Sequence, residues 1–544
     1  MNSMISKKYG WIVKIAAGII LIALMILSYS LQTHAATSSV SIVYSENSVT
    51  TSDTSAVEID GTAVQITENG TYTVSGSCSE GSLTVAKGLD DVTIILNGLD
   101  LTSSETAPIT VKKGSSVELI VKGTNTLTDA EDASTEDTND DFEGAAIKVK
   151  SGSELTISGT GTLNIDASDC KNGIKGAETA TITVEGATLN ITAANTGLAS
   201  DGEVNVTGGT ITITAENDGI KSEPDEDDTE SAGVVNISGG KITIYALTAD
   251  ESDAIWGQNE VNITGGTIYI EAGDDGIHSE YVTTIGTKGS SDGPDITIAS
   301  CVEGIEGATV NLYSGSASIV SSDDGVNAAN SDLTGYSYAL NITGGSWYVN
   351  AGGDGLDSNG SLTVSGGETI VFGGTAQDEN ALDYDGTFSI TGGQLIGVGQ
   401  AGVFASTNTS CLNYSNLSIQ KGTVITVKDA SGEEVLSVTA VKNATNVVYA
   451  DGTTMSGYTL YVNGSAVSST GAGQFGQTGQ FGQNSRFGQE TMPGNTQNTQ
   501  NNQNMFGNQN TQNSGNTSNT QNQFFNQFRQ GLQNFFGGMM QGRR

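Results

Sequence analysis

The chain has 544 residues, of which 61 are acidic and 21 basic, so the formal net charge is −40. This charge argues against binding to nucleic acid or to an anionic membrane surface, because phosphate groups would be repelled. The 72 glycines, together with Val and Ile at short intervals, argue against a helical bundle and against general disorder.

The first 35 residues have the pattern of a secretory signal peptide. Two lysines precede an apolar stretch at residues 15–27, and Thr33 and Ala35 are the small residues expected before a cleavage site. The alternative is an uncleaved N-terminal anchor, because residues 11–27 are nearly long enough to span a bilayer. Both interpretations predict a secreted or cell-surface protein that touches a membrane only through this segment.

Two phrases recur along the middle of the chain and predict its fold. The first is Asn-Ile-Thr-Gly-Gly or a close variant, as at Asn236, Asn262 and Asn341, and a short alternating strand follows most copies. The second is Asp-Gly-Ile or a close variant, and its Gly or Ala falls at positions 173, 197, 219, 254, 276, 304, 325, 355 and 381. The base period is about 22 residues, and longer steps contain inserted loops. Such a period, with three short strands and Gly-rich corners, is typical of one rung of a parallel β-helix.

Composition and register divide the rest of the chain. We expect the β-helix to span residues 43–411, with less regular rungs before residue 163. Residues 412–467 are expected to form a small antiparallel β module that covers the open edge of the last rung. Residues 471–544 are rich in Gln, Asn, Gly and Phe, which predicts a disordered tail; the alternative is a self-association segment, because Phe among amides is aggregation-prone.

The repeat also constrains the cysteines. Cys170 and Cys301 each lie three residues before a repeat Gly, so they occupy the same column, five rungs apart. With neighbouring strands about 4.8 Å apart, they would be separated by about 24 Å, which is too far for a disulfide. We therefore expect buried free thiols.

Carboxylates recur in register at the repeat corners. Stacked at about 4.8 Å, they repel unless they protonate or share a cation, and oxygen ligands favour Ca²⁺. We expect one cluster at Asp274, Asp275 and Glu280, a second at Asp354, Asp357, Asp383 and Asp385, and a third at Glu223, Asp225 and Asp253; Asp218 and Asp324 occupy the same corner position as Asp253. The alternative is a solvated acidic face with Asx turns.

Outside the repeat, the acidic run at residues 129–141 has no partner in another rung. We therefore expect it to be a solvated loop.

Ca²⁺ held on a long flat face would suit an acidic or hydroxyl-rich polysaccharide. Trp256, Tyr269 and Tyr348 are candidates to stack on sugar rings, and Lys221 and His278 share the column of Trp256. The alternative for each aromatic residue is ordinary strand packing. His278 is the only His after the signal segment, and a lone His is more often structural than catalytic.

The Asn-Ile-Thr-Gly-Gly phrase, the Asp-Asp-Gly-Ile-His-Ser-Glu phrase at residues 274–280 and the acidic loop after Lys221 resemble a family of secreted bacterial proteins known as carbohydrate-binding domain-containing proteins. The resemblance covers about residues 43–467. It implies a pectate-lyase-like right-handed parallel β-helix, bound Ca²⁺, and affinity for cellulose and for acidic sugars such as polygalacturonate.

Three functions follow from these observations. We expect a non-catalytic, Ca²⁺-dependent polysaccharide binder. The first alternative is a pectate-lyase-like enzyme; most such lyases use Arg as the base, but the chain has no Arg before Arg486, so Lys221 would have to serve. The second alternative is a surface adhesin or structural protein with no affinity for sugars.

Overall fold

The structure is a computed structural model that describes residues 39–467, except 140, 225–232, 247–251, 377–378 and 401–409. The predicted signal segment, the Gln/Asn-rich tail and Asp225 therefore lie outside the described residues. Within the described residues, no helix has the length and apolar character needed to cross a membrane.

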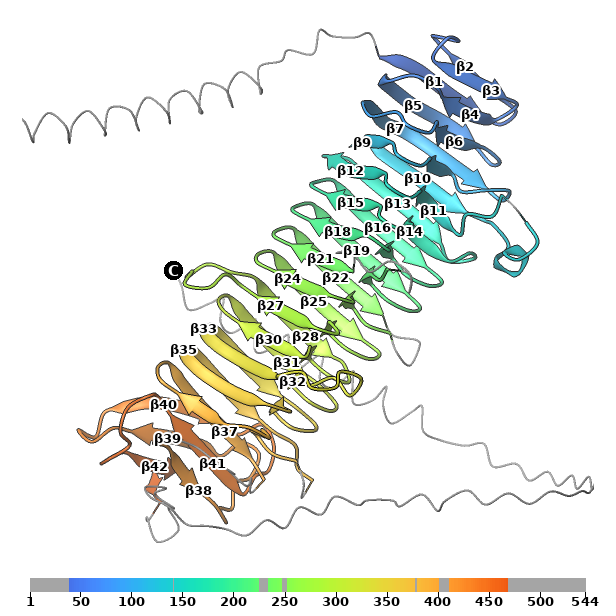
Figure 1. Ribbon diagram of the computed structural model, residues 1–544. Coiled ribbons are helices and arrows are strands. Elements are labelled where there is room, and N and C mark those ends of the chain that lie inside the picture. The colour runs from blue at the N-terminus through green and yellow to red at the C-terminus, as the bar shows by residue number, and fades with distance from the viewer. Residues whose placement is uncertain are drawn as a thin grey trace, which may run out of the picture. The chain divides into compact units, whose positions relative to one another are not determined.

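The expected parallel β-helix is confirmed. One turn consists of β18 (Glu203–Val206), β19 (Thr210–Ala215) and β20 (Ile220–Ser222). Each of these strands pairs in parallel with its equivalent in the following turn, β21 (Val234–Ile237), β22 (Lys241–Ala246) and β23 (Ile255–Gly257). Figure 1 shows the turns stacked one on another. About 12 turns hold about 26 residues each on average. The step from Leu198 to Ile220, which contains no inserted loop, has the expected length of 22 residues. Inserted loops in other turns raise the average to about 26 residues.

The strands form three faces. The first face contains β9 (Ser116–Lys122), β12 (Glu154–Gly159), β15 (Thr181–Val184), β18, β21, β24 (Glu260–Ile263), β27 (Val282–Ile285), β30 (Thr309–Leu312) and β36 (Phe388–Ile390). The second contains β10 (Thr124–Asp129), β13 (Thr162–Ala167), β16 (Thr188–Ala193), β19, β22, β25 (Thr267–Ala272), β28 (Asp295–Ser300), β31 (Ser316–Val320) and β37 (Gln394–Gly399). The long strands β5 (Gly70–Cys78), β7 (Val92–Ser103), β33 (Ala339–Asn350) and β35 (Ser361–Phe372) run through both faces.

The third face is the short-strand sheet. Its parallel strands are β4 (Ala63–Ile66), β6 (Ser82–Val85), β8 (Ile109–Val111), β11 (Ala145–Val149), β14 (Asn172–Gly176), β17 (Leu198–Ser200), β20, β23, β26 (Ile277–His278), β29 (Ile305–Glu306), β32 (Val326–Ala328) and β34 (Leu356–Ser358). At the N-terminal end, β1 (Val40–Ser45) pairs with β2 (Ser48–Thr51), and β3 (Val57–Asp60) pairs with β4, both in antiparallel fashion.

Alternation of buried and exposed residues builds the core. Inward residues such as Ile211, Ile242 and Ile268 occupy one column and are at most 1% exposed. The repeat glycine lets the corner close over the next inward column, which contains Ile213, Ile244 and Ile270. A Cβ at Gly219 would lie 2.3 Å from Ile244 Cγ2 and 2.5 Å from the Ala254 carbonyl oxygen. The repeated Gly is therefore a packing requirement at this corner.

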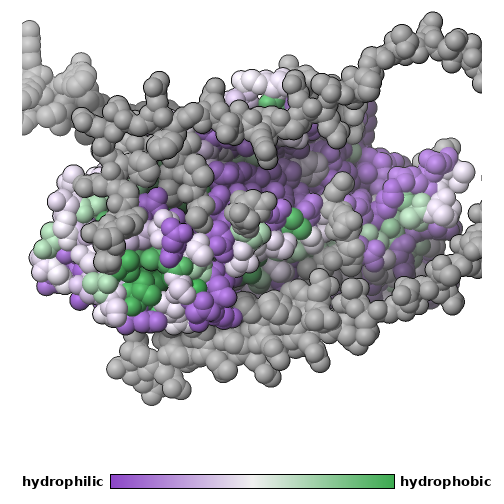
Figure 2. All heavy atoms as spheres, turned by 90° about the horizontal axis from the view of Figure 1, so that it is seen from below, coloured by the Kyte–Doolittle hydropathy of each residue, from purple (hydrophilic) through white to green (hydrophobic). Residues whose placement is uncertain are grey.

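The C-terminal module is antiparallel, as expected. It contains β38 (Leu412–Tyr414), β39 (Val424–Lys428), β40 (Glu434–Thr439), β41 (Asn446–Ala450), β42 (Thr459–Val462) and β43 (Ser465–Ala466). Strand β41 pairs antiparallel with β37, so the module continues the last strand of the second face. In the view from below, the surface is mainly hydrophilic, with a compact hydrophobic area at the end where this module lies (Figure 2).

Two predictions outside the repeat phrases had different outcomes. All four cysteines are free, and Cys170 and Cys301 are buried, as expected. The solvated-loop prediction for residues 129–141 is wrong at its start, because Asp129 and Glu131 are each only 1% exposed. Asp129 ends β10 at an inward position of the strand, so alternation buries it.

Candidate functional site

Two adjoining hollows lie over the short-strand sheet, and together we call them the groove. The lysine hollow, of about 390 Å³, is lined among others by Lys148, Lys150, Lys171, Lys175 and Lys221. The acidic hollow, of about 900 Å³, is lined among others by Asp218, Asp253, Trp256, Asp274, Asp275, His278, Glu280, Glu303 and Glu306. Lys221, Glu223 and Asn195 line both hollows, so the two adjoin each other.

The predicted stacking of equivalent corner residues is confirmed. Along one column of the short-strand sheet, Lys148 pairs with Lys175, then Ala199, Lys221, Trp256 and His278 follow. Further along the same sheet, Glu306 pairs with Asn327 and Asn327 with Asp357. The outward side chains of one column therefore change from lysines to carboxylates along the helix axis.

The aspartates before the repeat Gly have a structural role that the sequence did not reveal. Oδ1 of Asp218 accepts a hydrogen bond from the backbone N–H of Asp253 at 3.2 Å, and Asp253 Oδ1 does the same for Asp275 at 3.0 Å. In the next turn, Asp275 Oδ1 accepts a hydrogen bond from the backbone N–H of Glu303 at 3.2 Å. One carboxylate oxygen of each residue thus joins adjacent turns, which leaves the second oxygen to act in the groove.

His278 lies among carboxylates at the centre of the acidic hollow. Its Nδ1 is 3.1 Å from Asp253 Oδ2 and 3.5 Å from Asp275 Oδ2, while Nε2 is 3.6 Å from Glu306 Oε2. Burial lowers the pKa of His278, but the hydrogen bond with Asp253 and the charge of Glu306 raise it by more, to about 9. The imidazole is therefore protonated at neutral pH and neutralises part of the cluster.

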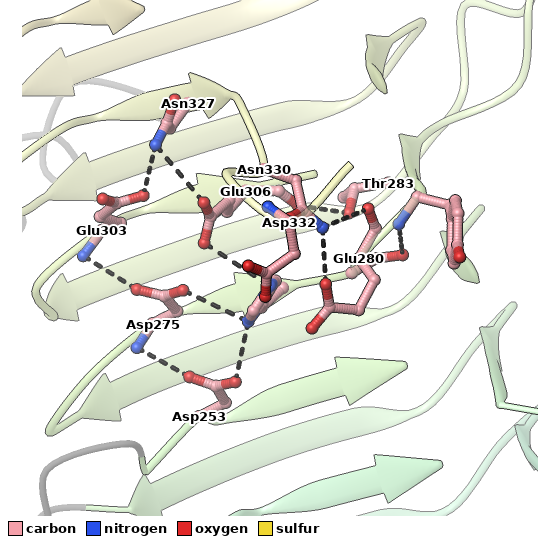
Figure 3. A network of polar contacts seen from close by, with 12 residues as sticks. Asp253, Asp275, Glu280, Thr283, Glu303, Glu306, Asn327, Asn330 and Asp332 are labelled. Carbon is pink, nitrogen blue, oxygen red and sulfur yellow. Dashed lines mark hydrogen bonds and ion pairs between the residues drawn. The ribbon is translucent and has the colours of Figure 1, made fainter. Parts of the chain in front are cut away.

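Glu303 and Glu306 complete this network, which Figure 3 shows from Asp253 to Asn327. Asn327 Nδ2 donates to Glu303 Oε2 at 2.8 Å and to Glu306 Oε1 at 3.4 Å. Burial, followed by the charges of neighbouring carboxylates, raises the pKa of Asp275 to about 11 and that of Glu303 to about 7. These side chains are crowded enough that they hold protons unless a cation joins them.

Four groups in and beside the short-strand sheet each bring three possible ligand atoms within 4.8 Å of one another. They are Asp253, Asp275 and His278; Asp275, Glu303 and Glu306; Asp323, Asp324 and Glu379; and Asp354, Asp357 and Asp383. The last group contains three of the four residues expected to cluster there; Asp385 is not in it. Burial and nearby carboxylates raise the pKa of Asp324 and Asp357 to about 7 and that of Asp354 to about 6.

The other expected cluster members are arranged differently. Asp275 meets Glu303 and Glu306 in the groups above, whereas Asp274 and Glu280 line the acidic hollow without joining them. Glu280 Oε2 accepts a hydrogen bond from Asn330 Nδ2 at 2.6 Å. Glu223 pairs with Lys221 at 3.0 Å rather than with Asp253. Glu303 and Glu306 were not predicted as ligands, although both lie at the repeat positions that carried the signal.

Lys221 and Trp256 lie where the two hollows meet. Lys221 Nζ is 3.1 Å from Asp218 Oδ2 and 4.0 Å from the centre of the Trp256 ring. Burial lowers the pKa of Lys221, but the carboxylates of Asp218 and Glu223 raise it by more. The ammonium group therefore stays charged, which suits anion binding or cation–π contact better than proton abstraction.

Within the lysine hollow, most ammonium groups are paired. Lys150 pairs with Glu143, Lys171 with Glu136 and Lys175 with Asp201. Lys148 has no ion pair among the described residues; burial, followed by the charge of Lys150, lowers its pKa. Sequence reasoning missed this hollow, because Lys150 and Lys171 lie outside the repeat column.

The other two predicted aromatic contacts lie on the second face, outside the lining of both hollows. Tyr269 is in contact with Tyr245, their ring centres 6.2 Å apart, and its hydroxyl donates to Glu271 Oε1 at 2.5 Å. Tyr348 packs against Phe372 and the hydrophobic cluster of the C-terminal module. The structure therefore does not bring Tyr269 and Tyr348 together with Trp256.

Comparisons with known proteins assign the chain to a protein family. A family model described as carbohydrate-binding domain-containing protein matches residues 60–339. A protein of that description from Acetivibrio thermocellus is 35% identical over 113 residues, which cover 20% of this chain and 38% of that protein. A solved structure of a polysaccharide lyase-like protein from C. thermocellum, in a gadolinium derivative, is 28% identical, covers 47% of this chain and 96% of that one, and has a TM-score of 0.40. Because the family model spans more than half of the 544 residues, the chain belongs to the carbohydrate-binding domain-containing protein family.

Proposed function

We propose that this protein is a secreted or cell-surface, non-catalytic binder of acidic polysaccharide. It holds the polysaccharide along the groove and along the carboxylates that follow the groove on the short-strand sheet, with the help of Ca²⁺. The observation that carries the proposal is that the lysine and acidic hollows adjoin on one sheet of a protein from a carbohydrate-binding family. A regular linear polymer can follow a regular column of side chains, whereas a small ligand would need only one turn.

The carboxylate groups are suited to Ca²⁺. Asp354, Asp357 and Asp383 offer only oxygen ligands. Burial, followed by the charges of neighbouring carboxylates, raises the pKa of Asp354 and of Asp357, and a divalent cation would offset that repulsion. The group with His278 fits Ca²⁺ less well, because an imidazolium already neutralises it. Where Ca²⁺ is bound, it supplies a positive charge that can join protein carboxylates to the carboxylates of a uronate chain.

The lysine hollow offers a second way to bind the same chain. Lys148 has no carboxylate partner among the described residues and can pair with a sugar carboxylate directly. We therefore expect polygalacturonate-type chains to bind more strongly than cellulose, which lacks carboxylates. A lyase that uses Lys221 as base is less well supported, because two carboxylates raise the pKa of that lysine.

The test uses the purified full chain with polygalacturonate, with cellulose as the uncharged comparison. Pull-down and absorbance near about 235 nm are recorded with Ca²⁺ and with a chelator, since uronate β-elimination creates an absorbing double bond. Binding that chelation removes, with no rise in absorbance, supports the proposal. A rise in absorbance would replace it with the lyase, and absence of binding to both glycans would favour a structural surface protein.

A further inference from the structure

A buried group of three possible metal ligands lies outside the groove. It consists of Asp129, Glu131 and Cys170. They are 1%, 1% and 5% exposed, and one possible ligand atom from each lies within 4.8 Å of the others. Asp129 ends β10, and Cys170 lies in the corner after β13, the strand with which β10 pairs. The three residues therefore meet between two adjacent turns of the β-helix.

Asp129 lies in a column in which the preceding turn has Ser103 and the following turns have alanine. Because Thr128 pairs with Asp166, the next residue, Asp129, lies in the same column as Ala167. This column continues on the second face with Ala193 and Ala215. All of these alanines face inward and are buried. A carboxylate at this position loses hydration that an alanine never needed, and this costs several kcal/mol unless the charge is neutralised or compensated.

The hydrogen bonds around the group leave one oxygen unused. Asp129 Oδ1 accepts from the backbone N–H of Glu131 at 3.1 Å, while Oδ2, which is fully buried, has no hydrogen-bond partner among the described residues. Both oxygens of Glu131 accept backbone N–H groups, from Glu143 at 2.8 Å and Gly144 at 3.1 Å, which fixes this carboxylate in place. Asp129 Oδ2 is thus a buried oxygen beside a second carboxylate and the Cys170 thiol, which interacts with the Asp129 carboxylate.

In the part of the chain that the structure describes, no lysine forms an ion pair with these two carboxylates. The nearest basic side chain in sequence to Cys170 is Lys171, which instead pairs with Glu136 and lies 6.0 Å from the ring centre of Phe142. Among the described residues, the two buried carboxyl groups thus have no opposite charge to pair with.

Cys301 provides a comparison within the same molecule. It occupies the same corner column five turns further on, and it is also a buried free thiol. Its Sγ donates to the Val320 carbonyl oxygen at 3.5 Å, as expected for a structural cysteine. For Cys170 Sγ, the described residues provide no such backbone acceptor, and two carboxylates lie beside it instead.

We propose that Asp129, Glu131 and Cys170 bind a thiophilic divalent cation, of which Zn²⁺ is the natural example. A thiolate with two carboxylates suits Zn²⁺ and does not suit Ca²⁺, which takes oxygen ligands. Around a tetrahedral zinc ion, sulfur and oxygen ligands lie about 3.5 Å apart. The three ligand atoms, which lie within 4.8 Å of one another, would therefore move closer together around the ion. The ion would join two adjacent turns and would fix the base of the loop at residues 132–142.

The test uses the full chain after chelation, gel filtration and reloading with Zn²⁺ or Co²⁺. We expect one tightly bound ion per chain, and with Co²⁺ a near-ultraviolet sulfur-to-metal charge-transfer band that only thiolate ligation produces. Cys170→Ser should abolish the band and Asp129→Asn should weaken Co²⁺ binding at least tenfold. Cys301→Ser, the matched control, should leave both unchanged.

Three outcomes would overturn the proposal. They are no retained Zn²⁺ in the wild-type chain, no thiolate band with Co²⁺, or a band that Cys301→Ser removes. The measurements on the wild-type chain alone can refute the proposal. The test therefore remains decisive even if a variant misfolds. Asp129→Asn keeps the side-chain shape, and its circular dichroism spectrum reports whether the β-helix is intact.

Discussion

Two regions of the short-strand sheet, the lysine hollow and the carboxylates beyond the groove, differ although their backbone is the same. Lys148 and Lys175 occupy the column of outward positions in which Asn327 and Asp357 lie further along the same sheet. Hydrogen-bonded register is preserved from turn to turn, so the difference in chemistry comes from side chains alone. The comparison teaches that a β-helix can change the charge of a binding face stepwise, one residue per turn, without altering its fold.

The largest expected effect is the response of the carboxylates beyond the groove to Ca²⁺ and pH. Without the ion, the raised pKa values of Asp324, Asp354 and Asp357 mean that the folded state holds protons that the unfolded state releases. The stability contributed by those protons is fully present below about pH 4 and is lost as pH rises through about 6 to 7. Ca²⁺ would replace the protons, so its benefit should grow with pH.

Thermal unfolding with Ca²⁺ or with chelator at about pH 5 and about pH 8 measures this effect. A Ca²⁺ concentration about 100-fold above Kd should stabilise the folded chain by about 2.7 kcal/mol. We expect nearly all of that gain at the higher pH. An equal gain at both pH values would show that Ca²⁺ binds elsewhere than at the titrating carboxylates.

Asp357→Asn tests whether the group of Asp354, Asp357 and Asp383 binds Ca²⁺ itself, as opposed to the surrounding acidic surface. Removal of one charged ligand is expected to weaken Ca²⁺ binding by about 30-fold, or about 2 kcal/mol, and to weaken glycan binding with it. Asp385→Asn is the matched control, because Asp385 is exposed and lies outside the ligand group. Calorimetric titration with Ca²⁺ measures both variants. An equal loss of Ca²⁺ affinity in the two variants would contradict the proposed cluster.

The sequence predicted the turns and columns better than the site itself. Repeat spacing fixes which residues stack, so the column through Lys221, Trp256 and His278 could be read directly. The period does not tell which oxygen of Asp253 is engaged by the next turn, because that depends on the corner geometry. Nor could it show Asp129 facing inward, because the early turns lack the repeat phrases that set the register.

Lys148→Ala tests the lysine hollow. We expect polygalacturonate affinity to fall about tenfold, or about 1.4 kcal/mol, with a weaker dependence on salt and unchanged Ca²⁺ binding. Lys241→Ala is the control, since Lys241 is an exposed lysine on β22 of the second face. Fluorescence anisotropy with labelled oligogalacturonate measures both, and equal losses would mean that only the overall charge matters.

His278 reports on the boundary between the two regions. In Ca²⁺-free protein, its pKa should be about 9, so the imidazolium contributes stability that is present below about pH 6.5 and lost as pH rises through about 9. Asp253→Asn removes the charge next to Nδ1 and should lower the His278 pKa by about one unit, about 1.4 kcal/mol. NMR titration of the imidazole would contradict this network if its pKa stayed unchanged.

The smallest expected effect concerns Trp256, where the two hollows meet. Its ring lies 4.0 Å from Lys221 Nζ and 6.3 Å from the ring centre of His278, so packing alone accounts for part of its role. If the ring also stacks on sugar, Trp256→Leu should lower glycan affinity about fivefold, about 1 kcal/mol, and Trp256→Phe should lower it less. Parallel thermal unfolding separates the two roles. A drop in stability with unchanged affinity would assign Trp256 to packing, whereas a drop in affinity at constant stability would extend the sugar-binding surface across the junction of the two hollows.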